Sequence, residues 1–373
     1  MWMLLVAFVA AFAVTLAVVR SGKRLEGLAG DHDLSGPQKF HARPVPRIGG
    51  VGILVGVVAG AGLGVWLGQL SIGLAAGLLI AALPTFVSGV AEDLTKSQSP
   101  RRRMFFTAVS AALAVWLVDA VITRTDIPGL DWVVGFAAGA AVVTVFVVTG
   151  VANAVNIIDG FNGLASMCVA LMLAGLAYVA FLLGDLPIAW LALVGIAALA
   201  GFFVWNFPAG LVFLGDGGAY FIGFYLAELA ILLLHRNPGL SPMFPLLLCI
   251  YPVFETLFSI YRKKLLRGMS PGMPDGVHLH MLVFKRLMRW AIGNRETHTL
   301  TRRNSMTSPY LWILCSLSVV PAVLFYDSTP IQALCIVLFG ITYLGLYWRI
   351  VRFKSPRWLV FSSSRQRRRR RRG

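Results

Sequence analysis

The chain has 373 residues, of which 58% are hydrophobic and 13% are charged, and its mean hydropathy is +0.77. This composition excludes an ordinary soluble protein and indicates an integral membrane protein, because continuous apolar runs of about 20 residues are long enough to cross a bilayer as helices. The formal net charge is +17, from 33 Lys and Arg against 16 Asp and Glu. A basic excess of this size favours anionic partners.

Apolar runs predict an all-α polytopic bundle with about eleven transmembrane helices. Residues 2–19 could pass for a secretory signal, but no small-residue cleavage site follows, so they are predicted to be a retained first helix. Residues 1–350 are predicted to form one transmembrane domain, and residues 351–373 a basic cytoplasmic tail. The expected spans are 2–19, 48–68, 71–90, 104–122, 132–150, 164–183, 187–206, 217–234, 243–262, 309–326 and 331–349.

The basic residues predict the orientation of the bundle. Of the 33 Lys and Arg, 31 fall in four segments, 20–47, 96–103, 262–303 and 349–372. An odd number of spans places all four on one side, which the positive-inside rule makes cytoplasmic. The N-terminus is therefore expected outside and the C-terminus in the cytoplasm, in a multi-pass protein of the bacterial inner membrane. The Arg run 367–372 is expected to bind anionic lipids.

The segment 153–165 carries the most informative motif. Asn153, Asn156 and Asp159 recur every three residues at the end of an apolar run, a spacing that places them on one helix face. Polar groups at a membrane boundary are costly unless they bind something. The turn that follows, with Asn162 between glycines, lets the backbone approach a ligand closely. The motif predicts a substrate and metal site on a membrane enzyme.

Two further acidic motifs lie at predicted span ends. Glu92 and Asp93 are adjacent carboxylates that repel each other, which favours a general base or a metal ligand, and Lys96 and Arg102 follow them. The alternative is an ordinary acidic helix end. Asp216 stands between glycines at a span start, where open amides suit phosphate and a carboxylate suits Mg²⁺. The alternative there is a turn with an Asp cap.

Basic and histidine side chains supply candidate contacts to anions. Lys39, His41 and Arg47 lie in a Pro- and Gly-rich loop that could attract phosphate, or else lipid headgroups. His278 and His280 have no Cys or third His nearby, so zinc is not predicted and hydrogen bonds to a sugar or phosphate fit better. The alternative for this histidine segment is a solvated loop.

Two acidic residues, Glu228 and Glu255, fall inside predicted spans. Carboxylates within a membrane usually mark a functional site or face a polar interior. The two interpretations left open for them are a functional role and interhelical packing with a hydrogen-bonded partner.

These motifs, in this order, resemble the polyprenyl-phosphate N-acetylhexosamine-1-phosphate transferases, and most closely their WecA-like branch. The resemblance covers about residues 1–350. It implies transfer of a sugar-1-phosphate from a UDP-sugar to undecaprenyl phosphate with release of UMP. It also implies a requirement for Mg²⁺, with Mn²⁺ as an alternative. Phosphoryl transfer depends mainly on positioning and charge neutralisation. The segments that carry the resemblance are 41–50, 92–93, 153–164, 213–217, 267–271 and 278–280.

The resemblance also implies residue roles. Asn156 and Asp216 would hold the metal on the diphosphate. Glu92 and Asp93 would lie near the attacking lipid phosphate, and Asp159 would position nucleotide or phosphate; these three are the expected catalytic residues. The expected partners are the UDP-sugar, undecaprenyl phosphate and anionic lipids, with no nucleic acid and with a homodimer left open. The expected substrate-binding residues are Lys39, His41, Arg47, Lys96, Arg102, Asn153, Asn162, His278 and His280.

The chain departs from the family pattern at three positions. Glu92 replaces the first Asp of the usual pair, and Gly276 and Met281 stand where the family often has Arg and a last His. These departures leave the sugar open. The run of three consecutive His typical of phospho-N-acetylmuramoyl-pentapeptide transferases is absent, so that activity is the weaker alternative. A transporter or lipid-binding scaffold is a further alternative, disfavoured because the polar motifs gather at one membrane face rather than at mid-membrane.

Overall fold

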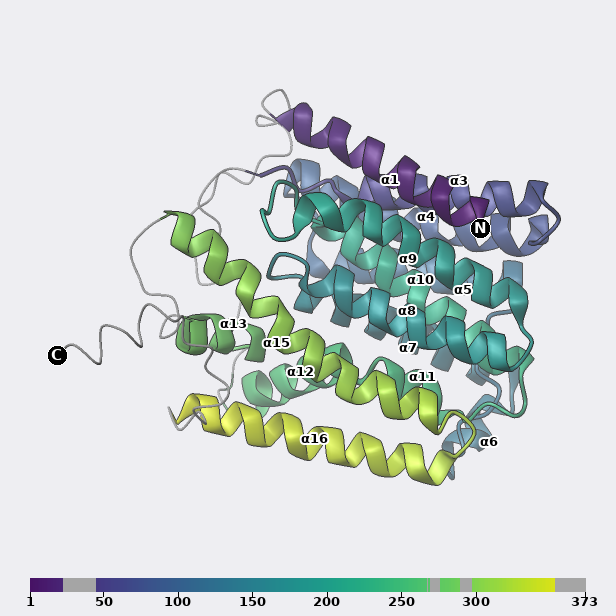
Figure 1. Cartoon of the computed structure of the whole chain (residues 1–373). Helices are drawn as coiled ribbons and strands as arrows, with labels where there is room; N and C mark the ends of the chain where they lie inside the picture. Colours follow the sequence, from purple (N-terminus) through teal and green to yellow (C-terminus); the bar gives the residue numbers. More distant parts are fainter. Residues whose placement is uncertain (23–44, 267, 269–275, 289–296, 353–373) are drawn as a thin grey trace.

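The computed structural model describes residues 1–22, 45–266, 268, 276–288 and 297–352, and its regular structure there is helical. The helices run roughly side by side in a bundle (Figure 1). They are α1 (Trp2–Arg20), α3 (Gly50–Trp66), α4 (Ile72–Thr95), α5 (Pro100–Val118), α6 (Leu130–Val134), α7 (Ala137–Ile158), α8 (Leu164–Leu182), α9 (Leu186–Asn206), α10 (Gly215–Arg236), α11 (Met243–Leu248), α12 (Ile250–Tyr261), α13 (Leu279–Leu282), α15 (Thr297–Leu324) and α16 (Thr329–Val351), with π-helical η1 (Arg262–Leu266) and η2 (Val283–Met288).

Within the described residues, eight helices are long and apolar enough to cross a membrane: α1, α4, α7, α8, α9, α10, α15 and α16. The prediction of a polytopic all-helical membrane protein is therefore confirmed. The other predicted spans correspond to α3, which has 17 residues, to α5, and to the pair α11 and α12. The number eleven and the orientation remain predictions.

The span predicted at 243–262 is wrong as a single helix. Helix α11 ends at Leu248 and α12 begins at Ile250. Pro252 gives the physical reason, because proline has no amide hydrogen to bond the carbonyl of Leu248 four residues earlier. The break leaves α12 as a separate 12-residue helix whose polar positions lie near the end of the bundle that carries the sequence motifs.

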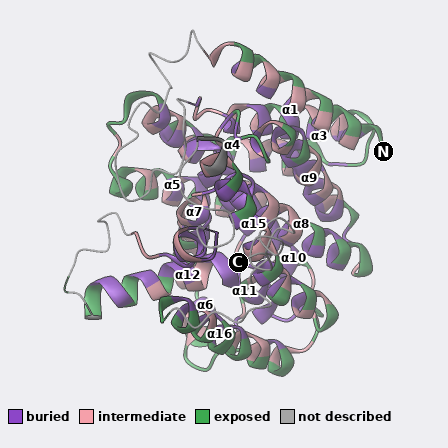
Figure 2. Ribbon diagram, turned by 60° about the vertical axis from the view of Figure 1, so that its left-hand side comes forward, coloured by how far each residue is buried: buried purple, intermediate pink, exposed green. Residues whose placement is uncertain are grey.

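Helix α10 is the central element of the bundle. Its membrane-spanning window is entirely buried, whereas those of α1 and α16 are only 28% buried, and Figure 2 shows buried residues inside the bundle and exposed ones around it. Glycines allow α10 to approach its neighbours very closely. A Cβ atom on Gly89 of α4 would overlap the backbone of Gly217, and one on Gly50 of α3 would overlap Gly218. These approaches draw α3 and α4 onto the first turn of α10.

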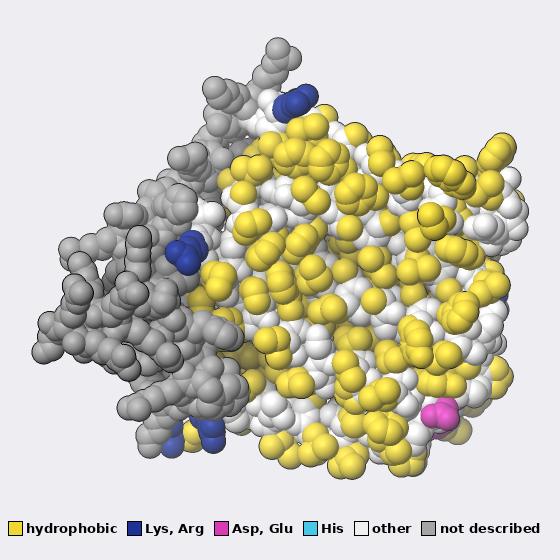
Figure 3. Space-filling model, viewed as in Figure 1, with side chains coloured by type: hydrophobic (Ala, Val, Ile, Leu, Met, Phe, Trp, Pro, Cys, Tyr) yellow, Lys and Arg dark blue, Asp and Glu magenta, His cyan; other side chains and the backbone are white. Residues whose placement is uncertain are grey.

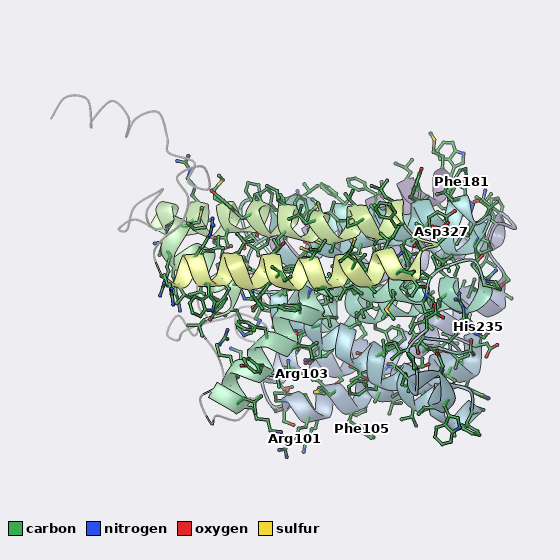
Figure 4. The ribbon with its side chains drawn as sticks, turned by 90° about the horizontal axis from the view of Figure 1, so that it is seen from below. Arg101, Arg103, Phe105, Phe181, His235 and Asp327 are labelled. Atoms are coloured by element: carbon green, nitrogen blue, oxygen red, sulfur yellow. The ribbon has the colours of Figure 1, made fainter. Side chains whose placement is uncertain are left out.

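The surface and the two ends of the bundle differ in chemistry. Hydrophobic side chains cover the face in Figure 3, and the clearly visible Lys and Arg side chains lie toward its left edge. Figure 4 places Arg101 and Arg103 toward one end of the bundle, and His235 and Asp327 toward the other. The sequence motifs of α4, α7 and α10 share the end with Arg103. Lys39, His41 and residues 353–373 of the predicted tail lie outside the described residues.

Candidate active site

The end of α4 and the start of α10 are joined through Asp93. Its carboxylate oxygens accept hydrogen bonds from the backbone amides of Asp216, at 2.8 Å, and Gly217, at 2.9 Å. Its side chain is buried at 3% exposure. Because the first amides of a helix have no partner within the helix, Asp93 acts as a cap supplied by another helix. Asp93 therefore fixes where Asp216 stands.

The loop before α3 lies against the same helix start. Phe213 donates its amide to the carbonyl of Pro46 at 2.8 Å, and Gly49 donates back to Phe213 at 3.0 Å. Gly215 has a φ of +75°, and a Cβ there would overlap the carbonyl of Arg47. Glycine is needed at this position both for its backbone conformation and for the close approach. The pairing holds Arg47 beside the first turn of α10.

Asp216 is the point at which three other helices meet α10. Its Oδ1 accepts a hydrogen bond from Asn156 Nδ2 of α7 at 2.8 Å. Its Oδ2 forms an ion pair with Arg103 of α5, and both side chains are 13% exposed. One turn further along, Tyr220 donates to Asn153 Oδ1 at 3.0 Å, and Arg103 lies 5.7 Å from the Tyr220 ring. The predicted pair of Asn156 and Asp216 is thus brought together.

Asp159 lies just past the end of α7, as its C-cap residue. Burial raises the pKa of its carboxyl from 3.8 to about 7; the nearby Arg47 opposes this shift and Asp216 adds to it. Two carboxylates that repel each other across a partly buried site, with cations beside them, form a site that gains from further positive charge.

The turn after α7 is bound to α15. The backbone carbonyl of Asn162 accepts a hydrogen bond from Ser308 Oγ at 2.6 Å. The backbone amide of Asn162 donates to Asn304 Oδ1 at 2.8 Å. Its side chain is 4% exposed and donates to Ser305 Oγ at 3.2 Å. Asn162 therefore contacts residues of α15 rather than an open site. It holds the turn in place beside Asp159.

The remaining predicted residues of the acidic loop lie at its surface. Glu92 accepts the amide of Gln98 through Oε2 at 2.6 Å, which closes the turn between α4 and α5. Lys96 is exposed and ends α4 with a φ of 52°. Arg102 is exposed, whereas its neighbour Arg103 contacts Asp216.

Arg103 is the functional candidate that the sequence prediction passed over in favour of Arg102. The register of α5 explains why Arg103, and not Arg102, reaches the site. Ser99 caps α5 with Pro100 in its first turn, and Thr107 and Ser110 of α5 hydrogen-bond Thr85 of α4. Residue 103 precedes Thr107 by four positions and so shares its face, which is turned toward α4.

The two histidines are stacked at the same end, with ring centroids 5.2 Å apart and planes 7° apart. His278 Nδ1 lies 3.0 Å from Glu255 Oε1. His280 is fully buried, and both its ring nitrogens lack a hydrogen-bond partner among the described residues. Burial lowers the pKa of His280 to about 3, so its ring is neutral at ordinary pH. Its ring contacts Phe161, at 5.7 Å between centroids, in the turn beside Asp159.

The side chains at this site are of the kind that bind Mg²⁺ together with substrate phosphates. In the part of the chain that the structure describes, no three His, Cys, Asp or Glu side chains form a complete metal cluster. Mg²⁺ is usually bound through one or two carboxylates together with substrate phosphates and water, and it does not need such a cluster. Asp216 and Asn156 would supply the protein's oxygen ligands; in this structure Asn156 Nδ2 donates to Asp216 Oδ1, and Arg103 forms an ion pair with Asp216 Oδ2.

Comparison with known proteins identifies the chain's relatives. Residues 75–234 match glycosyl transferase family 4. Over this region the chain is similar to that family. The matched region includes Asp93, Asn156 and Asp216 and ends before the histidines.

Several curated relatives are similar over much of the chain. One from Bacillus subtilis (strain 168), named "Probable undecaprenyl-phosphate N-acetylglucosaminyl 1-phosphate transferase", is 29% identical over 78% of this chain and 79% of its own length. The undecaprenyl-phosphate alpha-N-acetylglucosaminyl 1-phosphate transferase of Thermotoga maritima is 27% identical over 68% and 72%. A phospho-N-acetylmuramoyl-pentapeptide-transferase of Geobacillus kaustophilus is 29% identical over 53% and 64%.

Proposed function

We propose that the protein transfers an N-acetylhexosamine-1-phosphate from a UDP-sugar to undecaprenyl phosphate, giving undecaprenyl-diphosphate-sugar and UMP. An oxygen of the lipid phosphate attacks the sugar-linked phosphorus of the donor. The bond between the two donor phosphates breaks, and UMP leaves with the bridging oxygen. This would be an initiating step of a cell-surface polysaccharide.

The observation that carries the proposal is the meeting of Asp216, Asn156 and Arg103 at one end of the bundle. Both substrates are anionic and one is a lipid, so their reaction needs cations and ordered polar groups at the membrane surface. Arg103 and Arg47 supply cations there, and Asp93 fixes the first turn of α10. A transporter would place its polar groups at mid-membrane instead.

Individual residues have distinct tasks in this proposal. Asp216 and Asn156 would hold Mg²⁺, or Mn²⁺, which supplies positive charge to the donor diphosphate. Asp159 would position nucleotide or phosphate beside Arg47. Arg103, now paired with Asp216, would turn part of its hydrogen-bonding capacity to a substrate phosphate, because a guanidinium has donors for two anions at once.

The proposed setting is the bacterial inner membrane, with the site on the cytoplasmic side, where UDP-sugars are made. Arg124 and Arg236 then belong to the outer side; Arg236 lies 3.1 Å from Asp185. Two exposed residues test the orientation, Ser97 near the site and Thr123 at the other end. An impermeant thiol reagent should label Thr123→Cys and spare Ser97→Cys in intact cells; the reverse pattern would overturn the orientation.

Purified protein in lipid nanodiscs with undecaprenyl phosphate and Mg²⁺ tests the function against a panel of UDP-sugars. UMP release from UDP-N-acetylglucosamine or UDP-N-acetylgalactosamine supports the proposal. Release only from the UDP-muramoyl-pentapeptide would support the alternative activity instead. Absence of UMP with every donor, from folded protein, would reject both.

A further inference from the structure

Glu255 is a buried carboxylate whose two oxygens are both hydrogen-bonded. Its Oε1 lies 3.0 Å from His278 Nδ1 and accepts the backbone amide of Leu279, also at 3.0 Å. Its Oε2 accepts the Tyr343 hydroxyl at 2.7 Å. The carboxylate therefore connects α12, α13 and α16. These contacts give Glu255 hydrogen-bonded partners, and one of them is a predicted substrate-binding histidine.

The hydrogen bonds determine which nitrogen of His278 can meet a ligand. Tyr343 and the Leu279 amide are donors to Glu255, so the carboxylate acts as an acceptor toward His278 too, and Nδ1 carries the proton. Nε2 is then the only ring nitrogen left for another partner. His278 is 6% exposed at its side chain and Glu255 is 1% exposed, so the ring is held firmly.

The neighbouring His280 differs from His278, because no carboxylate among the described residues fixes its ring. His280 lies parallel to His278 but has no hydrogen bond to either nitrogen among the described residues. Its ring instead packs on Phe161, next to Asp159. A contact chain thus runs from Glu255 through the two stacked rings to the turn of the active site, and only His278 in it is fixed by a carboxylate.

We propose that Glu255 is a positioning residue for the transfer reaction: with Tyr343, it fixes the His278 ring so that Nε2 faces a phosphate or hydroxyl oxygen of the sugar-phosphate donor. The inference rests on the proposed function. A buried carboxylate between apolar helices is expensive, and apolar packing would stabilise the fold equally well, so the ring that it orients accounts for a carboxylate at this position.

The test is a double-mutant cycle in the full-length enzyme. Glu255→Gln keeps size and one acceptor oxygen but removes the charge, and His278→Ala removes the ring. We expect Glu255→Gln to lower kcat/KM by about 10–100-fold, by analogy with the range for residues that orient metal-binding histidines. In the His278→Ala background the same change should cost little, because residues that act through one another are not additive.

Glu228→Gln is the matched control. Glu228 is another fully buried carboxylate, and both its oxygens lack a partner among the described residues. It lies 12 positions beyond Asp216 on α10, about 18 Å along the helix axis. This variant should keep wild-type turnover. Thermal unfolding of every variant shows whether the fold is retained, and Tyr343→Phe replaces Glu255→Gln in the cycle if the latter does not fold.

The outcomes separate the two proposals. If the wild type is active and the losses of Glu255→Gln and His278→Ala multiply in the double variant, the positioning role is wrong. A fully active Glu255→Gln would also overturn it. A loss of turnover in Glu228→Gln equal to that in Glu255→Gln would also overturn it, because replacing any buried carboxyl group would then have the same effect. A folded wild-type protein that releases no UMP would overturn the proposed function, and this inference with it.

Discussion

Two pairs of acidic residues, one pair at each end of the helical bundle, lie in contrasting surroundings. At the end away from the site, Asp185 accepts Asn237 Nδ2 at 3.2 Å and lies 3.1 Å from Arg236 Nε. Asp131 accepts both the amide and the hydroxyl of Thr125. At the site end, Asp159 and Asp216 repel each other instead. Asp185 and Asp131 stabilise loops, whereas the mutual repulsion of Asp159 and Asp216 favours the binding of a cation or a cationic group of the site.

The pKa values of two of these carboxyls, Asp131 and Asp159, express the same contrast. The hydrogen bond from the Thr125 side chain holds the pKa of Asp131 below its ordinary value. Burial raises the pKa of Asp159 to about 7. Acids that only stabilise a fold are expected to have lowered values, and raised values concentrate at functional sites.

The largest expected effect is that of Asp216→Asn. The amide removes the charge that would hold the metal and the ion pair with Arg103, so transfer should fall by about three orders of magnitude or more. The matched change at the other end, Asp185→Asn, should lower thermal stability and leave transfer nearly unchanged. Steady-state UMP release from both variants, at saturating Mg²⁺, measures this. Near-normal turnover of Asp216→Asn would contradict the assignment.

Arg103→Ala is expected to have the next largest effect. It removes a buried cation from Asp216, and loss of one charge-stabilising donor typically costs about 10²–10³-fold in kcat. Arg124→Ala is the control, because among the described residues Arg124 donates to backbone carbonyls at the far end, including that of Asn237 at 3.1 Å. The loss in Arg103→Ala should also exceed that in Arg102→Ala. Equal turnover of the Arg103 and Arg124 variants would remove Arg103 from the site.

Asp93→Asn should reduce both stability and transfer. The Asn side chain keeps one acceptor oxygen, but its NH₂ group then faces a backbone N–H of α10. One cap hydrogen bond is therefore lost, at a cost of about 0.5–2 kcal/mol. Thermal unfolding and UMP release are the measurements. Glu92→Gln should leave stability closer to wild type, because Glu92 accepts a hydrogen bond from one backbone amide, that of Gln98. A variant of Asp93 with unaltered unfolding temperature would show that it does not cap α10.

The smallest effect concerns the pH dependence of stability. Because the folded Asp159 has a pKa of about 7 against 3.8 for an unperturbed carboxyl, the folded state binds more protons than the unfolded chain between these values. Stability therefore falls as pH rises through that window. The Tm of ligand-free protein should drop by a few degrees from pH 5 to pH 7.5, and Asp159→Asn should flatten the curve. Mg²⁺ should stabilise wild type more at the higher pH.

Much of the fold could be predicted from the sequence, because long apolar runs leave a chain few alternatives to membrane helices. The meeting of Asn156 and Asp216 was also predictable, since both follow from span ends at one membrane face. The break at Cys249 depended on a single proline, Pro252, whose effect on an apolar run is not visible in its hydrophobicity.

The parts of the site that escaped prediction depend on helix rotation and on long-range contacts. Three consecutive arginines, 101–103, look equivalent in the sequence, and only the register of α5 turns Arg103 toward Asp216. The task of Asp93 could not be foreseen, because the amides it caps lie 123 and 124 residues away. Glu255 likewise meets His278 only through the packing of α12 against the segment that begins α13.

The most direct test of the account is the identity of the nucleotide that the wild-type enzyme releases. With UDP-N-acetylglucosamine or a related donor, undecaprenyl phosphate and Mg²⁺, the account predicts UMP and a lipid diphosphate-sugar in equal amounts, because the bond between the two donor phosphates breaks. Mass spectrometry of the lipid and chromatography of the nucleotide measure both products. Release of UDP with a lipid monophosphate-sugar would mean that the sugar alone is transferred, and would contradict the central claim.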